Sequence, residues 1–184
     1  MRITRRKTEF STPWFDLVAK SVESDSSGEP YYCLEMPDYV SVIALTGKLE
    51  VLLVKQYRPP VEKFTLELPS GHVDGGERPE QAARRELLEE TGYKAERMEL
   101  LGALHTDTGR SANKTWFYFA PDVRQDSSVR RLEEGIELVI LSEKELKKSI
   151  EKFRFDHAIH VAGVLLAVMQ NKIFKKKSAR RNRA

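Results

Sequence analysis

Residues 71–93 read GHVDGGERPEQAARRELLEETGY, a glycine-containing loop followed by a segment with helix signals at both ends. Pro79 suits the first turn of a helix, because the N–H that proline lacks would have no partner there. Gly92 suits the position just after the last turn, where a left-handed backbone is common. We therefore predict a loop that leads into a helix from Pro79 to Gly92.

Three carboxylates of this helix, Glu86, Glu89 and Glu90, are spaced three and four residues apart and so share one side of it. Arg85 can pair with Glu89 one turn on, but we expect no cation beside Glu86 and Glu90. Clustered carboxylates on a rigid helix suit Mg²⁺ or Mn²⁺, which prefer oxygen ligands. The alternative is an acidic, solvent-facing helix after a glycine loop.

The whole stretch resembles the Nudix box, in which a glycine, five residues, a glutamate and seven residues precede Arg-Glu-aliphatic-x-Glu-Glu-x-Gly-aliphatic. The matching positions are Gly71, Glu77, Arg85, Glu86, Leu87, Glu89, Glu90, Gly92 and Tyr93. Only Tyr93 departs from the aliphatic consensus. The resemblance extends outward, less specifically, over residues 14–166.

This resemblance implies roles for the residues of the box. It assigns divalent metal, Mg²⁺ or Mn²⁺, to Glu86, Glu90, Glu89 and the backbone carbonyl of Ser70. Glu89 and Arg85 also belong to the implied catalytic group, while Glu77 and Arg85 orient the loop and the helix, and Gly71 and Gly92 are structural. The metal would neutralise a diphosphate and lower the pKa of the attacking water.

The flanking segments VKQYRPP (54–60) and ELPSG (67–71) resemble the ADP-ribose and sugar-nucleotide pyrophosphatases. In that group an arginine at the position of Arg58 binds phosphate, for which a planar guanidinium is suited. A plain surface arginine is the alternative. One departure concerns the loop after the box, where ADP-ribose enzymes often carry a proline. Thr108 stands near that place, and ADP-glucose, GDP-mannose or another sugar nucleotide therefore stays open as the substrate.

Members of this group also have an extra N-terminal sheet that exchanges contacts across a homodimer. Residues 1–12 suggest an irregular arm, and the strands 14–22 and 31–35 form a hairpin around a turn at 24–30. The resemblance makes Trp14 the candidate for stacking on the base, with Tyr31 or Tyr32 as a second aromatic. Packing at a sheet edge is the alternative for Trp14.

Two further loops carry candidate residues. The group takes a catalytic glutamate from a loop well after the box, and Glu134 has the matching place, with Glu133 and Glu137 as alternatives. Such a glutamate would activate or position water. Arg110 and Asn113 could contact substrate hydroxyls or phosphate, or simply belong to a solvated loop. We interpret His157 and His160 as ordinary residues of the last helix.

The remaining pattern predicts an α/β (α+β) protein with a mixed, largely antiparallel sheet between helices. Strands are expected at 39–46, 49–57, 64–68, 100–105, 115–120 and 137–141, and helices at 142–152 and 156–174. We divide the chain into an arm and hairpin (1–40), a Nudix domain (41–174) and a basic tail (175–184). Ser142 and Glu145 form a capping box at the start of the first of these helices.

The distribution of charge along the chain limits which classes of partner, such as nucleic acid, the protein can bind. The ends 1–7 and 175–184 hold ten Lys or Arg and no acid, which leaves 21 basic and 28 acidic residues in 8–174. An acidic body is unlike a nucleic-acid-binding face, so RNA contact is expected at most through the tail.

The longest apolar run, 159–169, is shorter than the roughly 20 residues that a membrane span needs. A single cysteine, Cys33, excludes an intramolecular disulfide and favours the cytoplasm.

Together these features predict a Mg²⁺-dependent homodimeric hydrolase that splits a nucleotide sugar into a nucleoside monophosphate and a sugar phosphate. A nucleoside triphosphate or dinucleoside polyphosphate hydrolase with the same box is one alternative. A second is a non-catalytic Nudix module that senses a nucleotide or binds RNA, although such a module would be expected to lack carboxylates that this box retains.

Overall fold

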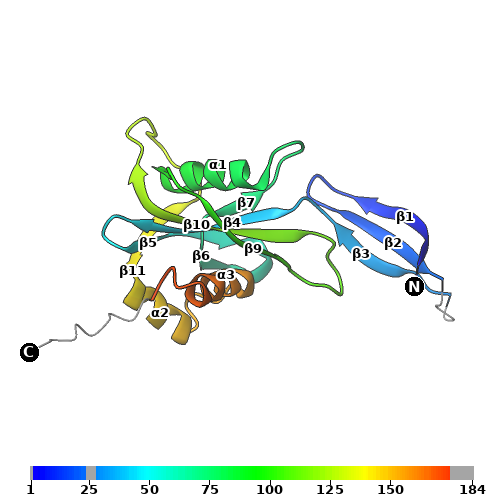
Figure 1. Cartoon of the computed structure of the whole chain (residues 1–184). Helices are drawn as coiled ribbons and strands as arrows, with labels where there is room; N and C mark the ends of the chain where they lie inside the picture. Colours follow the sequence, from blue (N-terminus) through cyan, green and yellow to red (C-terminus); the bar gives the residue numbers. More distant parts are fainter. Residues whose placement is uncertain (1, 24–27, 175–184) are drawn as a thin grey trace, which may run out of the picture.

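The computed structural model describes residues 2–23 and 28–174, so the basic tail 175–184 and the tip of the expected turn, 24–27, lie outside the described residues. The described chain forms a small N-terminal sheet and a larger central sheet with helices on both faces (Figure 1). No helix in the described ranges is both long and apolar enough to span a membrane.

The N-terminal sheet has the order β1-β2-β3 and is antiparallel throughout. Its strands are β1 (Ile3–Ser11), β2 (Asp16–Val22) and β3 (Tyr31–Glu35). The expected hairpin of β2 and β3 is confirmed, but the prediction of an irregular arm at 1–12 was wrong. Every residue of β1 is exposed, so β1 has no buried face to produce an alternating pattern in the sequence. Backbone pairing with β2 holds it instead.

The central sheet confirms the expected mixed and largely antiparallel arrangement. Its main path is β11-β5-β4-β10-β8, with β6 beside β5, β7 beside β4 and β9 beside β10. Only the pairing of β4 with β10 is parallel. The strands are β4 (Tyr39–Thr46), β5 (Glu50–Arg58), β6 (Lys63–Glu67), β7 (Ser70–His72), β8 (Tyr93–Lys94), β9 (Glu99–His105), β10 (Lys114–Gln125) and β11 (Glu137–Ser142).

Within residues 2–23 and 28–174 three α-helices complete the fold: α1 (Pro79–Thr91), α2 (Glu143–Glu151) and α3 (Ala158–Met169), besides a short 3-10 turn at Pro59–Val61. Gly92 ends α1 in the left-handed region at φ 72°, and Ser142 and Glu145 form the predicted capping box of α2. The last helix is shorter than the expected 156–174. In Figure 1, α1 covers one face of the central sheet, and α2 and α3 cover the other.

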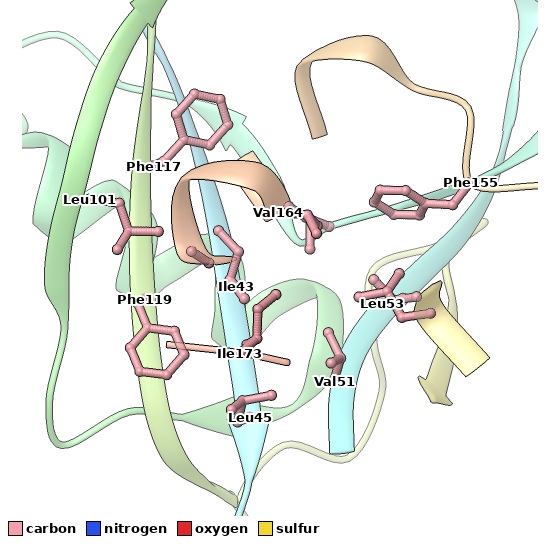
Figure 2. Close-up of a cluster of buried hydrophobic side chains, with 13 residues drawn as sticks. Ile43, Leu45, Val51, Leu53, Leu101, Phe117, Phe119, Phe155, Val164 and Ile173 are labelled. Carbon is pink, nitrogen blue, oxygen red and sulfur yellow. The ribbon is translucent and has the colours of Figure 1, made fainter. Parts of the chain in front are cut away.

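The core lies on both faces of the central strands because successive side chains of a strand point to opposite sides. On β4, Ile43 and Leu45 pack with residues of β10 and α3, including Phe117 and Val164 (Figure 2). The alternate β4 residues pack with Leu87 of α1 in a second cluster. The buried side of α1 therefore carries two carboxylates, Glu86 and Glu90, next to the apolar Ala83 and Leu87.

Candidate active site

A cleft of about 960 Å³ lies along α1. Its walls come from the loop before α1, the end of β5, the loop between β10 and β11, and the N-terminal segment. Among the residues that line it are Trp14, Gln56, Tyr57, Arg58, Ser70, Gly71, Arg85, Glu86, Glu89, Glu90, Glu133 and Glu134. The structure thus brings together most of the site residues that the sequence predicts, from segments up to 120 positions apart.

Arg85 is the centre of an ion-pair network that ties the loop to the helix. Its guanidinium lies 3.0 Å from Glu77, 2.7 Å from Glu86 and 3.2 Å from Glu89, and it also donates to the backbone carbonyl of His72 at 3.0 Å. The expectation that Glu86 has no cation beside it was therefore wrong. Adjacent residues of a helix do not normally face each other, but the Arg85 side chain is long enough for one nitrogen, Nη1, to reach both Glu86 and Glu89.

Glu86 lies directly against the backbone of Gly71. A Cβ atom at Gly71 would come within 2.1 Å of the Glu86 carboxyl group, which is closer than any non-bonded contact allows. The pairing of β7 with β4 holds Gly71 in this place, opposite Val40. The glycine is therefore required for the close approach of the helix carboxylate to the loop.

Glu90 is the most deeply placed carboxylate of α1, with only 4% of its surface exposed. It accepts a hydrogen bond from the backbone N–H of Ser70 at 2.8 Å, and no cation pairs with it among the described residues. Burial, with the negative charges of Glu86 and Glu133, raises its pKa to about 8. Burial likewise raises the pKa of Glu86, despite its bond to Arg85.

These observations test whether the site fits a divalent cation. Two buried carboxylates with raised pKa values, Glu86 and Glu90, lie beside Glu89 and Glu133 in one cleft. Within the described chain Arg85 pairs with Glu86 and Glu89 but not with Glu90. A Mg²⁺ or Mn²⁺ ion would supply the missing positive charge, and carboxylate oxygens are the ligands such ions prefer. The residues present therefore fit the predicted metal.

The loop between β10 and β11 brings two glutamates to the same cleft. Both Glu133 and Glu134 line it, and the backbone N–H of Glu133 donates to the carbonyl of Glu89 at 3.3 Å. Glu137, the third alternative, lies on β11, where it pairs with Lys55 at 2.9 Å. The charge of Glu133 contributes to the raised pKa values of Glu86 and Glu90. The geometry thus narrows the choice to Glu133 and Glu134.

The predicted substrate-binding residues divide into two groups. Trp14, 68% exposed, and Arg58 line the cleft. Tyr31 and Arg110 are not among the lining residues. The Tyr31 hydroxyl donates to the Gly109 carbonyl at 2.8 Å, and the Arg110 carbonyl accepts from the backbone of β3, so both join the N-terminal sheet to the loop after β9. Their substrate-binding roles stay predictions.

A second group of possible metal ligands lies behind the cleft, where Glu67, His157 and His160 place ligand atoms within 4.8 Å of one another. The two imidazole rings are stacked, with centroids 4.0 Å apart and planes at 15°. A metal binds in the plane of an imidazole at about 2.0–2.1 Å, and two nearly parallel planes do not meet that close to the rings. In this conformation the group does not fit a metal.

Comparison with known proteins agrees with this geometry. The NUDIX domain model matches residues 36–161 of the chain. The chain belongs to the Nudix family. The predicted Nudix hydrolase and the predicted fold are thereby confirmed.

The sequence is similar to those of several named proteins. The chain is 32% identical over 143 residues to an ADP-ribose pyrophosphatase of Bacillus subtilis (strain 168), covering 77% of each protein. It is 35% identical over 132 residues to a methanol dehydrogenase activator of Bacillus methanolicus, covering 72% of this chain and 70% of that protein. An ADP-sugar pyrophosphatase of Mus musculus is 54% identical over 78 residues, 40% of this chain and 36% of that protein.

A solved structure described as an ADP compounds hydrolase superposes with a TM-score of 0.76 over 94% of this chain and 96% of that one. At 22% sequence identity this similarity shows the fold, including the N-terminal sheet. It does not extend to the chemistry of individual residues, which we derive from the cleft itself.

Sequence reasoning missed several residues of the Nudix cleft and its surroundings, among them Gln56, Tyr57 and Glu67. Gln56 and Tyr57 line the cleft beside Arg58, and Glu67, fully buried, binds the Arg58 guanidinium. The signal was present in the segments 54–60 and 67–71, which we used only to identify a subgroup. A charged side chain is almost never fully buried without a partner, and Arg58 is the cation that pairs with Glu67.

The close contact between Gly71 and Glu86 gives a test of whether Glu86 is a metal ligand. Gly71→Ala should push the Glu86 carboxyl group out of place and weaken Mn²⁺ binding by about tenfold or more, because second-layer changes at metal sites commonly cost 10- to 100-fold in affinity. Titration calorimetry measures the effect. Gly75→Ala, in the same loop but with nothing within 4 Å of the added atom, is the matched control. Equal Mn²⁺ affinities in the two variants would contradict the assignment of Glu86.

Proposed function

We propose that this Nudix hydrolase splits the diphosphate of a nucleoside diphosphate sugar, such as ADP-ribose, in a Mg²⁺-dependent reaction that yields a nucleoside monophosphate and a sugar phosphate. The observation that carries the proposal is the placement of Glu86, Glu89 and Glu90 in one cleft with the phosphate-binding candidate Arg58. The names of the relatives, ADP-ribose pyrophosphatase and ADP-sugar pyrophosphatase, support the substrate class.

In this proposal Glu86, Glu90, Glu89 and the carbonyl of Ser70 hold the metal. When bound, it neutralises diphosphate charge and lowers the pKa of a water molecule. Arg58 binds a phosphate through its guanidinium, and Arg85 keeps the carboxylates of α1 in place. Glu134 or Glu133, across the cleft, accepts the proton of the attacking water.

We further propose that the enzyme is a homodimer in which the N-terminal sheet completes the substrate site. The sheet stands away from the central domain at one end (Figure 1), and Trp14 is 68% exposed although it lines the cleft. An indole so exposed would stack well on a base if a second subunit closed over it. We place the enzyme in the cytoplasm, where its one cysteine, buried Cys33, would stay reduced.

The substrate proposal is tested by product analysis. The purified protein with Mg²⁺ should release nucleoside monophosphate from ADP-ribose, ADP-glucose or GDP-mannose faster than from diadenosine polyphosphates or nucleoside triphosphates. Chelation of the metal should abolish the release, and Glu90→Gln should lower kcat by about 10²-fold or more because the buried amide cannot supply a charged ligand. Faster cleavage of triphosphates would reject the substrate class, and wild-type turnover by Glu90→Gln would reject the metal assignment.

The two loop glutamates are distinguished by substitution. Glu134→Gln should lower kcat by about 10²- to 10⁴-fold, the usual contribution of a general base, whereas Glu133→Gln should chiefly change the metal concentration needed for half-maximal rate. Steady-state kinetics at several Mg²⁺ concentrations separate these effects. If only Glu133→Gln produced the large loss of kcat, the general base would be Glu133.

A further inference from the structure

Arg58 lies between two cavities. Its side chain lines the catalytic cleft and also a second cavity of about 480 Å³, whose walls include Glu67, Thr65 and His160. The side chain is 41% exposed. An arginine with open space on two sides is poorly restricted by packing and would have many rotamers available. A specific interaction is therefore needed to give the guanidinium one orientation.

Glu67 supplies that interaction. Arg58 Nε donates to Glu67 Oε1 at 2.8 Å and Arg58 Nη2 donates to Glu67 Oε2 at 2.7 Å. Two parallel charge-assisted bonds fix the plane of a guanidinium as well as its position. Nη1 of Arg58 has no hydrogen-bond acceptor within residues 2–23 and 28–174 and is left available for a ligand.

Glu67 is itself rigidly held. Its side chain is fully buried, and the Thr65 hydroxyl donates to Glu67 Oε1 at 2.6 Å. The next residue, Leu68, donates its backbone N–H to His160 Nδ1 at 3.2 Å, which ties the end of β6 to α3. Because that nitrogen accepts a hydrogen bond, it cannot also donate to Glu67. The charge of Glu67 is thus directed to Arg58.

We propose that Glu67 is a positioning residue, which holds the Arg58 guanidinium ready at the edge of the catalytic cleft before substrate arrives. The inference rests on the proposed function and deepens it, because Arg58 is the phosphate-binding candidate there. An arginine ordered in advance loses less conformational entropy when it binds a phosphate, so Glu67 increases substrate affinity without touching substrate. An ion pair that only stabilises the fold would have no such effect.

Kinetics of Glu67→Gln test the proposal. Glutamine has the same size, but its amide nitrogen cannot accept a hydrogen bond from Arg58, so one arm of the fork is lost. We expect the KM for the nucleotide sugar to rise by about tenfold, with kcat within about threefold of wild type, as for a lost binding interaction. Thr65→Val is the matched control: it removes another hydrogen bond of Glu67 but leaves Arg58 paired, and KM should change by less than about twofold.

A double-mutant cycle separates positioning from general stability. In an Arg58→Ala background Glu67→Gln should change KM by less than about twofold, because no guanidinium is left to orient. Arg58→Ala also leaves a buried carboxylate unpaired, so Arg58→Lys serves as the second background if the alanine variant does not fold. A KM effect of Glu67→Gln that is equally large in the wild-type and Arg58-substituted chains would overturn the proposal.

An NMR measurement tests, without any turnover, whether Glu67 holds the Arg58 guanidinium in place. In the ligand-free wild-type chain the Arg58 Nε–H signal, assigned by its absence from Arg58→Lys, should exchange slowly with water in an NMR spectrum. The signal should disappear into fast exchange in Glu67→Ala, which removes both acceptor oxygens, and persist in Thr65→Val. Persistence in Glu67→Ala would overturn the proposal. A protected signal in a wild-type protein that cleaves no nucleotide sugar would instead reject only the proposed function.

Discussion

The burial of like-charged carboxylates on one helix is the constraint on which the rest of this structure depends. Glu86 and Glu90 are 8% and 4% exposed, and their pKa values are raised because burial disfavours the charged form. Arg85 offsets part of this cost through Glu86 and Glu89, while its contacts with Glu77 and the His72 carbonyl fix the preceding loop. The remaining deficit of positive charge is what makes the cleft suited to a divalent cation.

The fold keeps this unfavourable cluster in place by packing apolar residues of the same buried side of the helix. Leu87 of α1 packs into an apolar cluster on the central sheet, and the pairing of β7 with β4 sets Gly71 beneath Glu86. A Glu67–Arg58 pair secures the far side of the cleft in the same way. Rigid elements thus carry the charged groups, as precise placement of a reacting group requires.

Much of this arrangement was predictable from the sequence because its signals are local. The strands at Tyr31–Glu35 and Tyr39–Thr46, and the end of α1 at Gly92, agree with the patterns that predicted them. The carboxylates of the Nudix box also come together in one cleft, as expected for one side of a helix. Such features depend on spacing and on backbone preferences of single residues, which a sequence displays directly.

The features that were missed depend on partners distant in the chain. β1 carries no buried side chain, so only its pairing with β2 reveals it as a strand. The contacts by which Tyr31 and Arg110 join β3 to the loop after β9 also link segments far apart in the sequence, while their substrate-binding roles stay predictions. The β5–β6 register places Glu67 opposite Val54 and Arg58 opposite Lys63, so the pairing of Glu67 with Arg58 likewise depends on how the two long side chains meet and not on the spacing in the sequence.

In the proposed metal site Glu90 is a ligand, and burial raises the pKa of this carboxyl group to about 8, so metal binding must displace its proton at neutral pH. Titration calorimetry of Mg²⁺ into the metal-free protein at pH 7, repeated in buffers of different ionisation enthalpy, counts the protons released. Since the pKa of Glu90 is about 8, we predict release of about one proton per chain at pH 7 and markedly less at pH 9. Magnesium binding with no proton release at pH 7 would rule out Glu90 as a buried, protonated metal ligand.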